Sequence, residues 1–271
     1  MKKIRLTIMA LLLAGILAAC GTVNVEQGID AAEVFKNAEE ASKELNSFAM
    51  SGSIEQTMEA PDGEKMILDT QLEGKVIVDP MAGMQKMKMD IMGKTEEMIT
   101  YFNDEGFYMK EPQTSKWIKL PEKMMAQFGG MDKKQSNPAN QLEELKNYVD
   151  DFSLEEKDGE YLLHLTASGD KFKQLIKETI AEMGTGAEMP EEILSKMNVQ
   201  NLSYDFVVDK ESYFPKEMKM VMEMLLTAEG KTGNIAVEMS MDYSDYNEIK
   251  EINIPEEALN AAEMPLSGLP N

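Results

Sequence analysis

The sequence has very few of the residues that usually carry out chemistry. Its 271 residues include one cysteine, Cys20, one histidine, His164, and one arginine, Arg5. A single thiol excludes a disulfide framework within the chain. One histidine without a Gly-x-Ser-x-Gly motif leaves out the usual nucleophilic constellations. We therefore expect a protein that is not an enzyme and that has no cofactor. His164 lies on the strand face opposite its apolar neighbours, which predicts a surface or hydrogen-bonded residue rather than a catalyst.

The charge of the chain is strongly negative. Lysine and arginine total 27 against 49 aspartate and glutamate residues, a net charge of −22. Such a surface repels nucleic acid and anionic lipid head groups. The near absence of guanidinium groups also removes the best bidentate partner for phosphate. We therefore expect no nucleic-acid partner, and a domain body that stands off from a membrane surface.

The first twenty residues have the three-part pattern of an export signal. A basic start precedes an apolar run over residues 6–16, and the run ends in the residues LAAC. This pattern resembles a bacterial lipoprotein signal, in which LAAC is the lipobox. The alternative is a transmembrane anchor, but the apolar run is short of the roughly 20 residues that a spanning helix needs.

The resemblance to lipoproteins implies a role for the one thiol. In that class the cysteine sulfur is diacylglycerated and the peptide is cut before it, which makes Cys20 the expected lipidation site. We expect a signal peptide over residues 1–19, a lipidated N-terminus and spacer over residues 20–29, and one domain over residues 30–271. Two acyl chains, at about 0.8 kcal/mol per buried methylene group, hold a domain on a bilayer. The predicted location is the extracytoplasmic face of the cell membrane.

Period-two alternation of apolar and polar residues dominates the domain and predicts about ten half-buried strands joined by short turns. Neighbours linked in this way form an antiparallel sheet, and a sheet with such long strands is expected to curl. The expected strands cover residues 48–60, 66–78, 87–91, 98–102, 107–109, 116–120, 148–154, 161–165, 202–208, 218–226 and 235–243.

Helical periodicity interrupts the strands in a few blocks. Residues 32–45 and 171–183 each carry an apolar stripe, and the middle of the chain from Pro121 is also expected to be helical. A curled sheet needs cover on its inner face. The predicted fold class is therefore α+β, a large curved antiparallel sheet, or open half-barrel, with helices covering the concave face.

Four segments carry a resemblance to a known superfamily: AEEASKELNSFAMSGSIEQ, YFNDEGFYMKEPQTSKWIKL, VVDKESYFPKEMKM and INIPEEAL. With the lipobox and the expected half-barrel, they resemble the LolA/LolB-like and LppX/LprG-like lipoproteins, and most closely the uncharacterised lipoproteins of Gram-positive bacteria with this fold. The resemblance implies a cavity that holds acyl chains or lipidated polypeptides, or that senses envelope components.

Methionine is unusually frequent, with 25 residues, many at strand positions where valine or isoleucine is more usual. Thioether side chains are flexible and polarizable, so they adapt to ligands of varied shape. We therefore expect a wall for a lipid or other apolar ligand. Its candidate residues are Met218, Met220, Met222, Met224, Met239, Met241, Met87, Met89 and Trp117.

Two other interpretations of the methionines are open. They can be ordinary core residues, in which case the protein is an interaction or sensor module whose acidic surface binds an envelope protein. They can also bind Cu(I), which thioethers favour. Neighbours on one strand face are about 6 to 7 Å apart, however, which is too far for two sulfur atoms to chelate easily.

Overall fold

The computed structural model describes residues 29–91, 93–121, 138, 142, 145–167, 175, 197–228 and 230–264. Residues 1–30 and residues 31–271 form two separate units. The fold described below is that of the second unit. The expected signal peptide, Cys20 and most of the spacer lie outside the described residues.

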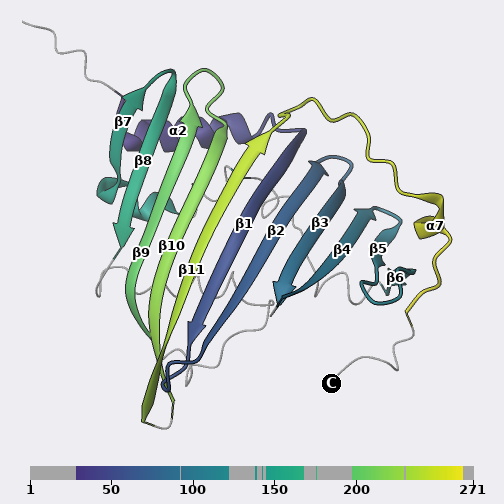
Figure 1. Ribbon diagram of the computed structural model, residues 1–271. Helices are drawn as coiled ribbons and strands as arrows, with labels where there is room; N and C mark the ends of the chain where they lie inside the picture. The colour runs from purple at the N-terminus through teal and green to yellow at the C-terminus, as the bar shows by residue number, and fades with distance from the viewer. Residues whose placement is uncertain are drawn as a thin grey trace, which may run out of the picture. The chain divides into compact units, whose positions relative to one another are not determined.

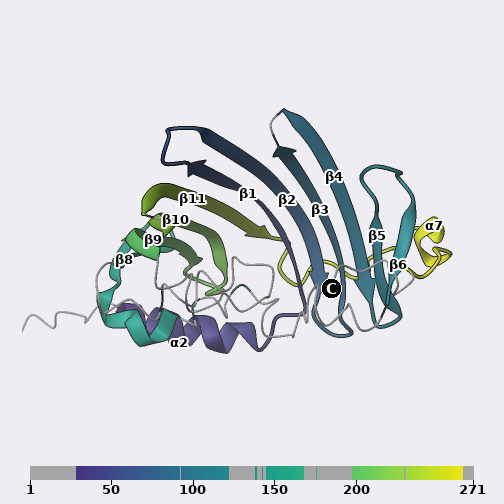
Figure 2. The ribbon, with the colours of Figure 1, turned by 90° about the horizontal axis from the view of Figure 1, so that it is seen from below.

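The second unit is built on one antiparallel sheet of eleven strands, in the order β6-β5-β4-β3-β2-β1-β11-β10-β9-β8-β7 (Figure 1). The predicted antiparallel pairing is confirmed. The sheet is open, with β6 and β7 at its two edges, and it is curved (Figure 2). The strands are β1 (Ser47–Glu59), β2 (Lys65–Ile77), β3 (Ala82–Ile91), β4 (Lys94–Asn103), β5 (Gly106–Lys110), β6 (Trp117–Leu120), β7 (Ser153–Lys157), β8 (Glu160–Ala167), β9 (Met197–Asp209), β10 (Pro215–Ala228) and β11 (Lys231–Ser244).

The turns lie where the sequence predicts them. In the β1–β2 turn the backbone N–H of Ala60 donates to the carbonyl of Glu64 at 2.8 Å, and Gly63 has a φ of 86°. Asp158 and Gly159 both have positive φ between β7 and β8, as a two-residue hairpin requires. One segment was predicted wrongly. Residues before β7 form a 3₁₀ helix, η1 (Lys146–Asp151), because this asparagine- and aspartate-containing stretch is a poor strand former.

The first and last strands of the sheet pair with each other at its centre. The register between β1 and β11 runs from Ala49 opposite Ser244 to Glu59 opposite Asn234. Asn247 secures this junction, because its side-chain oxygen accepts the N–H of Asn46 at 2.6 Å. The pairing joins the β1–β6 half of the sheet to the β7–β11 half.

One of the two predicted sheet-covering helices lies among the described residues. Helix α2 (Ala31–Ser42) buries Val34 and Ala38 completely. Its Phe35 ring is 5.1 Å from Phe152, which in turn lies 6.4 Å from Phe206 on β9. Figure 2 shows α2 on the inner side of the curve of β8–β11. The other helix lies outside the described residues except for Leu175, which is helical and buried, and so does most of the region after Pro121.

A C-terminal segment that was not predicted to be helical covers the β6 edge. Helix α7 (Glu256–Leu259) packs on β5 and β6. Beyond it, the N–H of Lys119 donates to the carbonyl of Ala262 at 3.0 Å, and the N–H of Met264 donates to the carbonyl of Lys119 at 2.9 Å. These bonds satisfy backbone groups that an edge strand otherwise exposes.

Candidate ligand-binding face

The predicted methionines, which lie on β3, β10 and β11, share one face of the sheet. We call this side of the sheet, which includes Met222 and Met224 of β10, the methionine face. Strand register places two of its cross-strand rows across seven strands. The first row is Phe206, Met218, Met241, Gly52, Leu72, Met87 and Met98, and the second row is Tyr204, Met220, Met239, Ile54, Thr70, Met89 and Glu96. Sequence alternation predicted which side chains of one strand point the same way. The structure adds the register, which shows which residues lie opposite one another on neighbouring strands.

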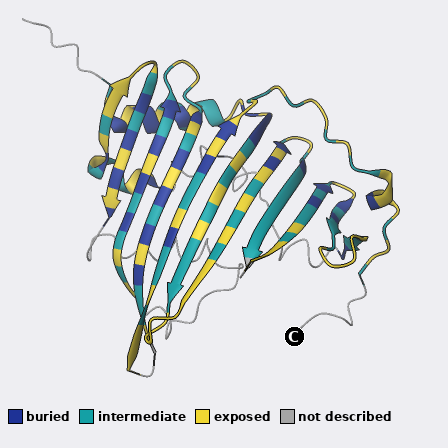
Figure 3. Ribbon diagram, viewed as in Figure 1, coloured by how far each residue is buried: buried dark blue, intermediate teal, exposed yellow. Residues whose placement is uncertain are grey.

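The methionine face is divided by how deeply it is buried. On β10, Met218, Met220, Met222 and Met224 are each at most 4% exposed. On β1 to β4, the residues of the same rows are only half-buried, including Met87 and Met89. Figure 3 shows the change, from strands banded in dark blue and yellow at β8–β10 to mostly teal strands near β3. The β10 part is therefore fully buried, and the β1–β4 part is accessible.

Glycines on this face let large side chains lie flat across the sheet. A Cβ atom placed at Gly52 would lie 2.4 Å from the Met241 sulfur, and one placed at Gly83 would lie 2.0 Å from the Phe102 ring. The Met241 sulfur therefore leans towards β1 and away from its register partner on β10, Met218. This geometry fits a packing role for Met241.

Trp117 lies on the opposite face from the methionines. Its register partner is Lys110, which alternates with Met109 of the methionine face. The Trp117 ring is 5.8 Å from Tyr101, and the Lys110 ammonium lies 5.9 Å from the ring centre. Trp117 and Tyr101 therefore form part of the predicted aromatic group around this hairpin. They lie on the outer face of the sheet, opposite the methionine face. A four-residue strand carries too little alternation to reveal its face.

The outer face of the sheet is polar and holds the lone histidine. His164 Nδ1 is 2.6 Å from Asp205 Oδ1, and its Nε2 is 3.0 Å from the Thr166 hydroxyl. The imidazole is half exposed. The prediction of a surface, hydrogen-bonded histidine is confirmed. Among the described residues, no group of three or more histidine, cysteine, aspartate or glutamate side chains is placed to hold a metal ion.

Four carboxylates form a continuous row on the outer face. Glu238 lies opposite Glu55, Glu55 opposite Asp69, and Asp69 opposite Asp90, across four adjacent strands. Like charges directly opposite each other in a sheet are destabilising. This row concentrates part of the net negative charge on one line.

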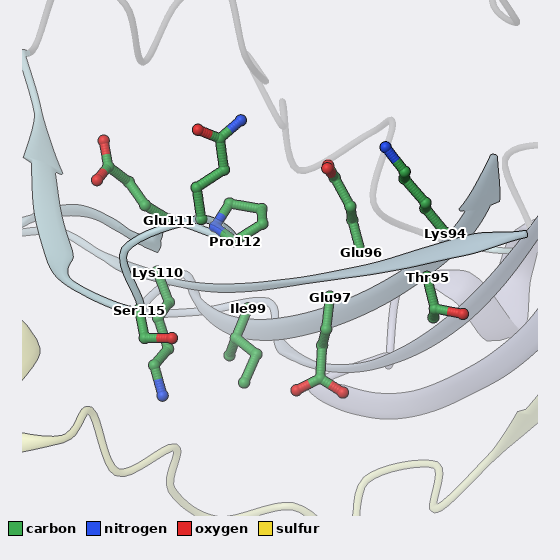
Figure 4. Close-up of a pocket in the computed structure, with 10 residues that line it drawn as sticks. Lys94, Thr95, Glu96, Glu97, Ile99, Lys110, Glu111, Pro112 and Ser115 are labelled. Atoms are coloured by element: carbon green, nitrogen blue, oxygen red, sulfur yellow. The ribbon is translucent and has the colours of Figure 1, made fainter. Parts of the chain in front are cut away.

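An open cavity of about 490 Å³ lies beside the first half of β4 (Figure 4). Strand β5 pairs with β4 only over residues 99–103, so no described strand covers residues 94–98 on that side. The β5–β6 loop forms the opposite wall. The lining residues are Lys94, Thr95, Glu96, Glu97, Ile99, Lys110, Glu111, Pro112, Gln113 and Ser115. This cavity was not predicted from the sequence, because the polar residues 94–97 do not alternate with apolar ones.

Two ionisable groups with shifted pKa values have structural roles at the far end of the sheet. Burial raises the pKa of the Tyr246 phenol, which donates a hydrogen bond to the carbonyl of Pro215 at 2.5 Å. Hydrogen bonds from Ser212 lower the pKa of Asp209, whose Oδ1 accepts the Ser212 N–H at 2.8 Å. Both groups stabilise the β9–β10 turn and its surroundings, away from the cavity.

Comparisons with known proteins give a family and distant structural matches. A family model described as a family of unknown function (DUF6612) matches residues 30–263, and no curated protein matches the chain. A LolA superfamily protein of Nitrosomonas europaea is 13% identical, with 84% of this chain and 96% of that chain covered and a TM-score of 0.25. A DUF1329 family protein of Desulfovibrio piger is 11% identical, with 82% and 96% covered and a TM-score of 0.24. A beta-barrel-like DUF1849 protein of Brucella abortus is 8% identical, with 74% and 100% covered and a TM-score of 0.24.

Proposed function

The chain belongs to the DUF6612 family of unknown function, and we propose that it is a membrane-anchored extracytoplasmic protein that binds a lipid or another apolar ligand without catalysing a reaction. The proposed site is the half-buried part of the methionine face, on β1 to β4. The observation that carries the proposal is the contrast in burial across the methionine face, which is fully buried at Met222 and half-buried at Met89.

The side-chain chemistry of the half-buried part supports an apolar ligand of variable shape. Met87, Met98 and Met89 lie next to one another across β3 and β4. Unbranched thioethers repack around ligands more easily than valine or isoleucine, which are stiff at the first side-chain torsion. An accessible apolar face made of such residues is typical of a binding surface rather than of a uniquely packed core.

Membrane anchoring is proposed from the N-terminal sequence. The apolar run and the residues LAAC support lipidation at Cys20. No helix among the described residues is long and apolar enough to cross a membrane. We further propose that α2, together with a helix over residues 171–183, covers the concave face, as in the LolA/LolB-like proteins that the sequence resembles.

The proposal is tested by extracting the purified Cys20→Ser protein with organic solvent and identifying apolar molecules by mass spectrometry. Displacement of a neutral fluorescent probe then locates the site. We expect Met87→Gln and Met89→Gln to weaken probe binding severalfold while the thermal transition is retained. Lys88→Gln is the matched control, since Lys88 lies between these two residues on the opposite face.

Two results would contradict the proposal. The first is an extract without apolar molecules from a protein that also fails to bind the neutral probe. That result favours the alternative of an interaction module, whose acidic row of Glu238, Glu55, Asp69 and Asp90 would attract a cationic protein surface. The second is equal loss of probe binding in Lys88→Gln and Met89→Gln.

A further inference from the structure

Glu96 places a carboxylate on the apolar methionine face. It is the register partner of Met89 and precedes Met98 by two residues, so it shares their side of β4. Its side chain is half-buried. A carboxylate next to apolar groups loses part of its hydration, and a cationic partner offsets that loss.

Glu96 also lines the cavity beside β4. Figure 4 shows Glu96, Glu111 and Lys94 on one side of the β4 ribbon, and Glu97 with Lys110 on the other. Glu96 therefore belongs both to the lining of the cavity and to the methionine face, where Met89 is its register partner.

The other two carboxylates of the cavity already have partners. Glu97 forms an ion pair with Lys86, N···O 3.2 Å, and lies 3.9 Å from Lys88. Glu111 accepts a hydrogen bond from the Thr114 hydroxyl at 2.6 Å. Among the described residues, no ion pair or side-chain hydrogen bond joins Glu96 to another group, and Lys94 lies beyond ion-pair distance of it. Glu96 is thus the carboxylate of this cavity that is available to a ligand.

We propose that the cavity takes the cationic head group of an amphiphile, an alkylamine or alkylammonium, whose chain lies on the β1–β4 part of the methionine face. This inference rests on the proposed function, since the methionine face supplies the binding energy of the chain. The net charge of −22 attracts cations over long range and disfavours fatty-acid anions. A cavity of about 490 Å³ lies in the size range of small-molecule sites.

Three twelve-carbon amphiphiles test the head group: dodecyltrimethylammonium, dodecanol and dodecanoate, each below its micelle concentration. Displacement of a neutral fluorescent probe from the Cys20→Ser protein gives the three affinities. We expect the cation to bind tightest and its advantage to shrink as salt is added. Glu96→Gln should weaken binding of the cation about two- to fivefold, as expected for a partly exposed ion pair, and leave dodecanol unchanged. Lys94→Gln should strengthen binding of the cation.

Two further variants separate a local effect from a general one. Glu97→Gln removes the same charge from the next residue, which lies on the other side of the ribbon and already pairs with Lys86, and should weaken cation binding less than Glu96→Gln does. Glu96→Asp keeps the charge and should retain most of the affinity. Equal effects of Glu96→Gln and Glu97→Gln, or equal binding of all three amphiphiles, would overturn the inference and leave the proposed function standing. Failure of every amphiphile to displace the probe would reject the proposed function itself.

Discussion

Truncation of two methionines on the same face should have very different costs. Met222 is completely buried on β10, with Leu202 and Val237 as its register partners on the two neighbouring strands. Met222→Ala removes this apolar volume from closed core, where large-to-small substitutions of methionine cost about 2–5 kcal/mol. At a cost near 3 kcal/mol, a domain of this size should lose about 6–12 °C in melting temperature.

Met89→Ala removes the same atoms from the half-buried part of the face. Part of the side chain is already hydrated there, and no closed cavity forms, so the expected loss is below about 1.5 kcal/mol. The assay is urea unfolding of both variants and the wild type, in the Cys20→Ser background, with the slope of the free energy of unfolding compared alongside the midpoint.

The ratio of the two losses in free energy of unfolding tests whether the methionine face has a buried part and an accessible part. A loss at position 89 as large as that at position 222 would refute the division of the methionine face into a closed part and an accessible part. Adding an apolar ligand should raise the stability of the wild type more than that of Met89→Ala, because ligand binding to the folded state stabilises it.

Three further predictions concern other parts of the chain. Cys20→Ser should abolish incorporation of a labelled fatty acid and membrane retention, and unchanged acyl labelling of this variant would exclude Cys20 as the attachment site. Asp69→Lys places a cation opposite Glu55 in the carboxylate row and should stabilise the domain by a few tenths to about 1 kcal/mol, with a gain that disappears in high salt; a loss of stability would contradict the repulsion. Because the pKa of Asp209 is lowered in the folded state, its contribution is complete above the unfolded pKa near 4 and is lost as pH falls below it. Asp209→Ala should therefore be destabilised at pH 7, with a difference from the wild type that narrows below pH 4 in thermal melts; a constant difference would be evidence against this role.

Period-two alternation carried most of the fold prediction, and its failures have local causes. The long strands around Met220 and Met239 alternate over many residues, so their inward face could be assigned from the sequence. Trp117 could not be placed, because β6 has only four residues. The 3₁₀ helix of Lys146–Asp151 contains two good strand formers, Tyr148 and Val149, but asparagine and aspartate on both sides of them are poor strand formers.

The candidate site was only partly visible in the sequence. The methionines were identified, but their division into buried and half-buried sets depends on register across strands that are far apart in the chain. Glu96 was missed because residues 94–97 are all polar and look like a turn extension. They form a strand because β3 supplies a partner along their whole length.

Because β1 pairs with β11, the sheet cannot be completed until the end of the chain has been synthesised. The paired positions, such as Glu59 with Asn234 and Ala49 with Ser244, are about 175 to 195 residues apart in the chain. At 5–20 residues per second, ribosomes need roughly 10 to 40 s to add the last strand after the first. For that time one edge of β1 has no partner from its own chain, and it can pair with another polypeptide instead. A nascent chain of this topology therefore benefits from a chaperone that binds the exposed strand edge. A chain truncated before β11 should aggregate, because its two half-sheets are not joined.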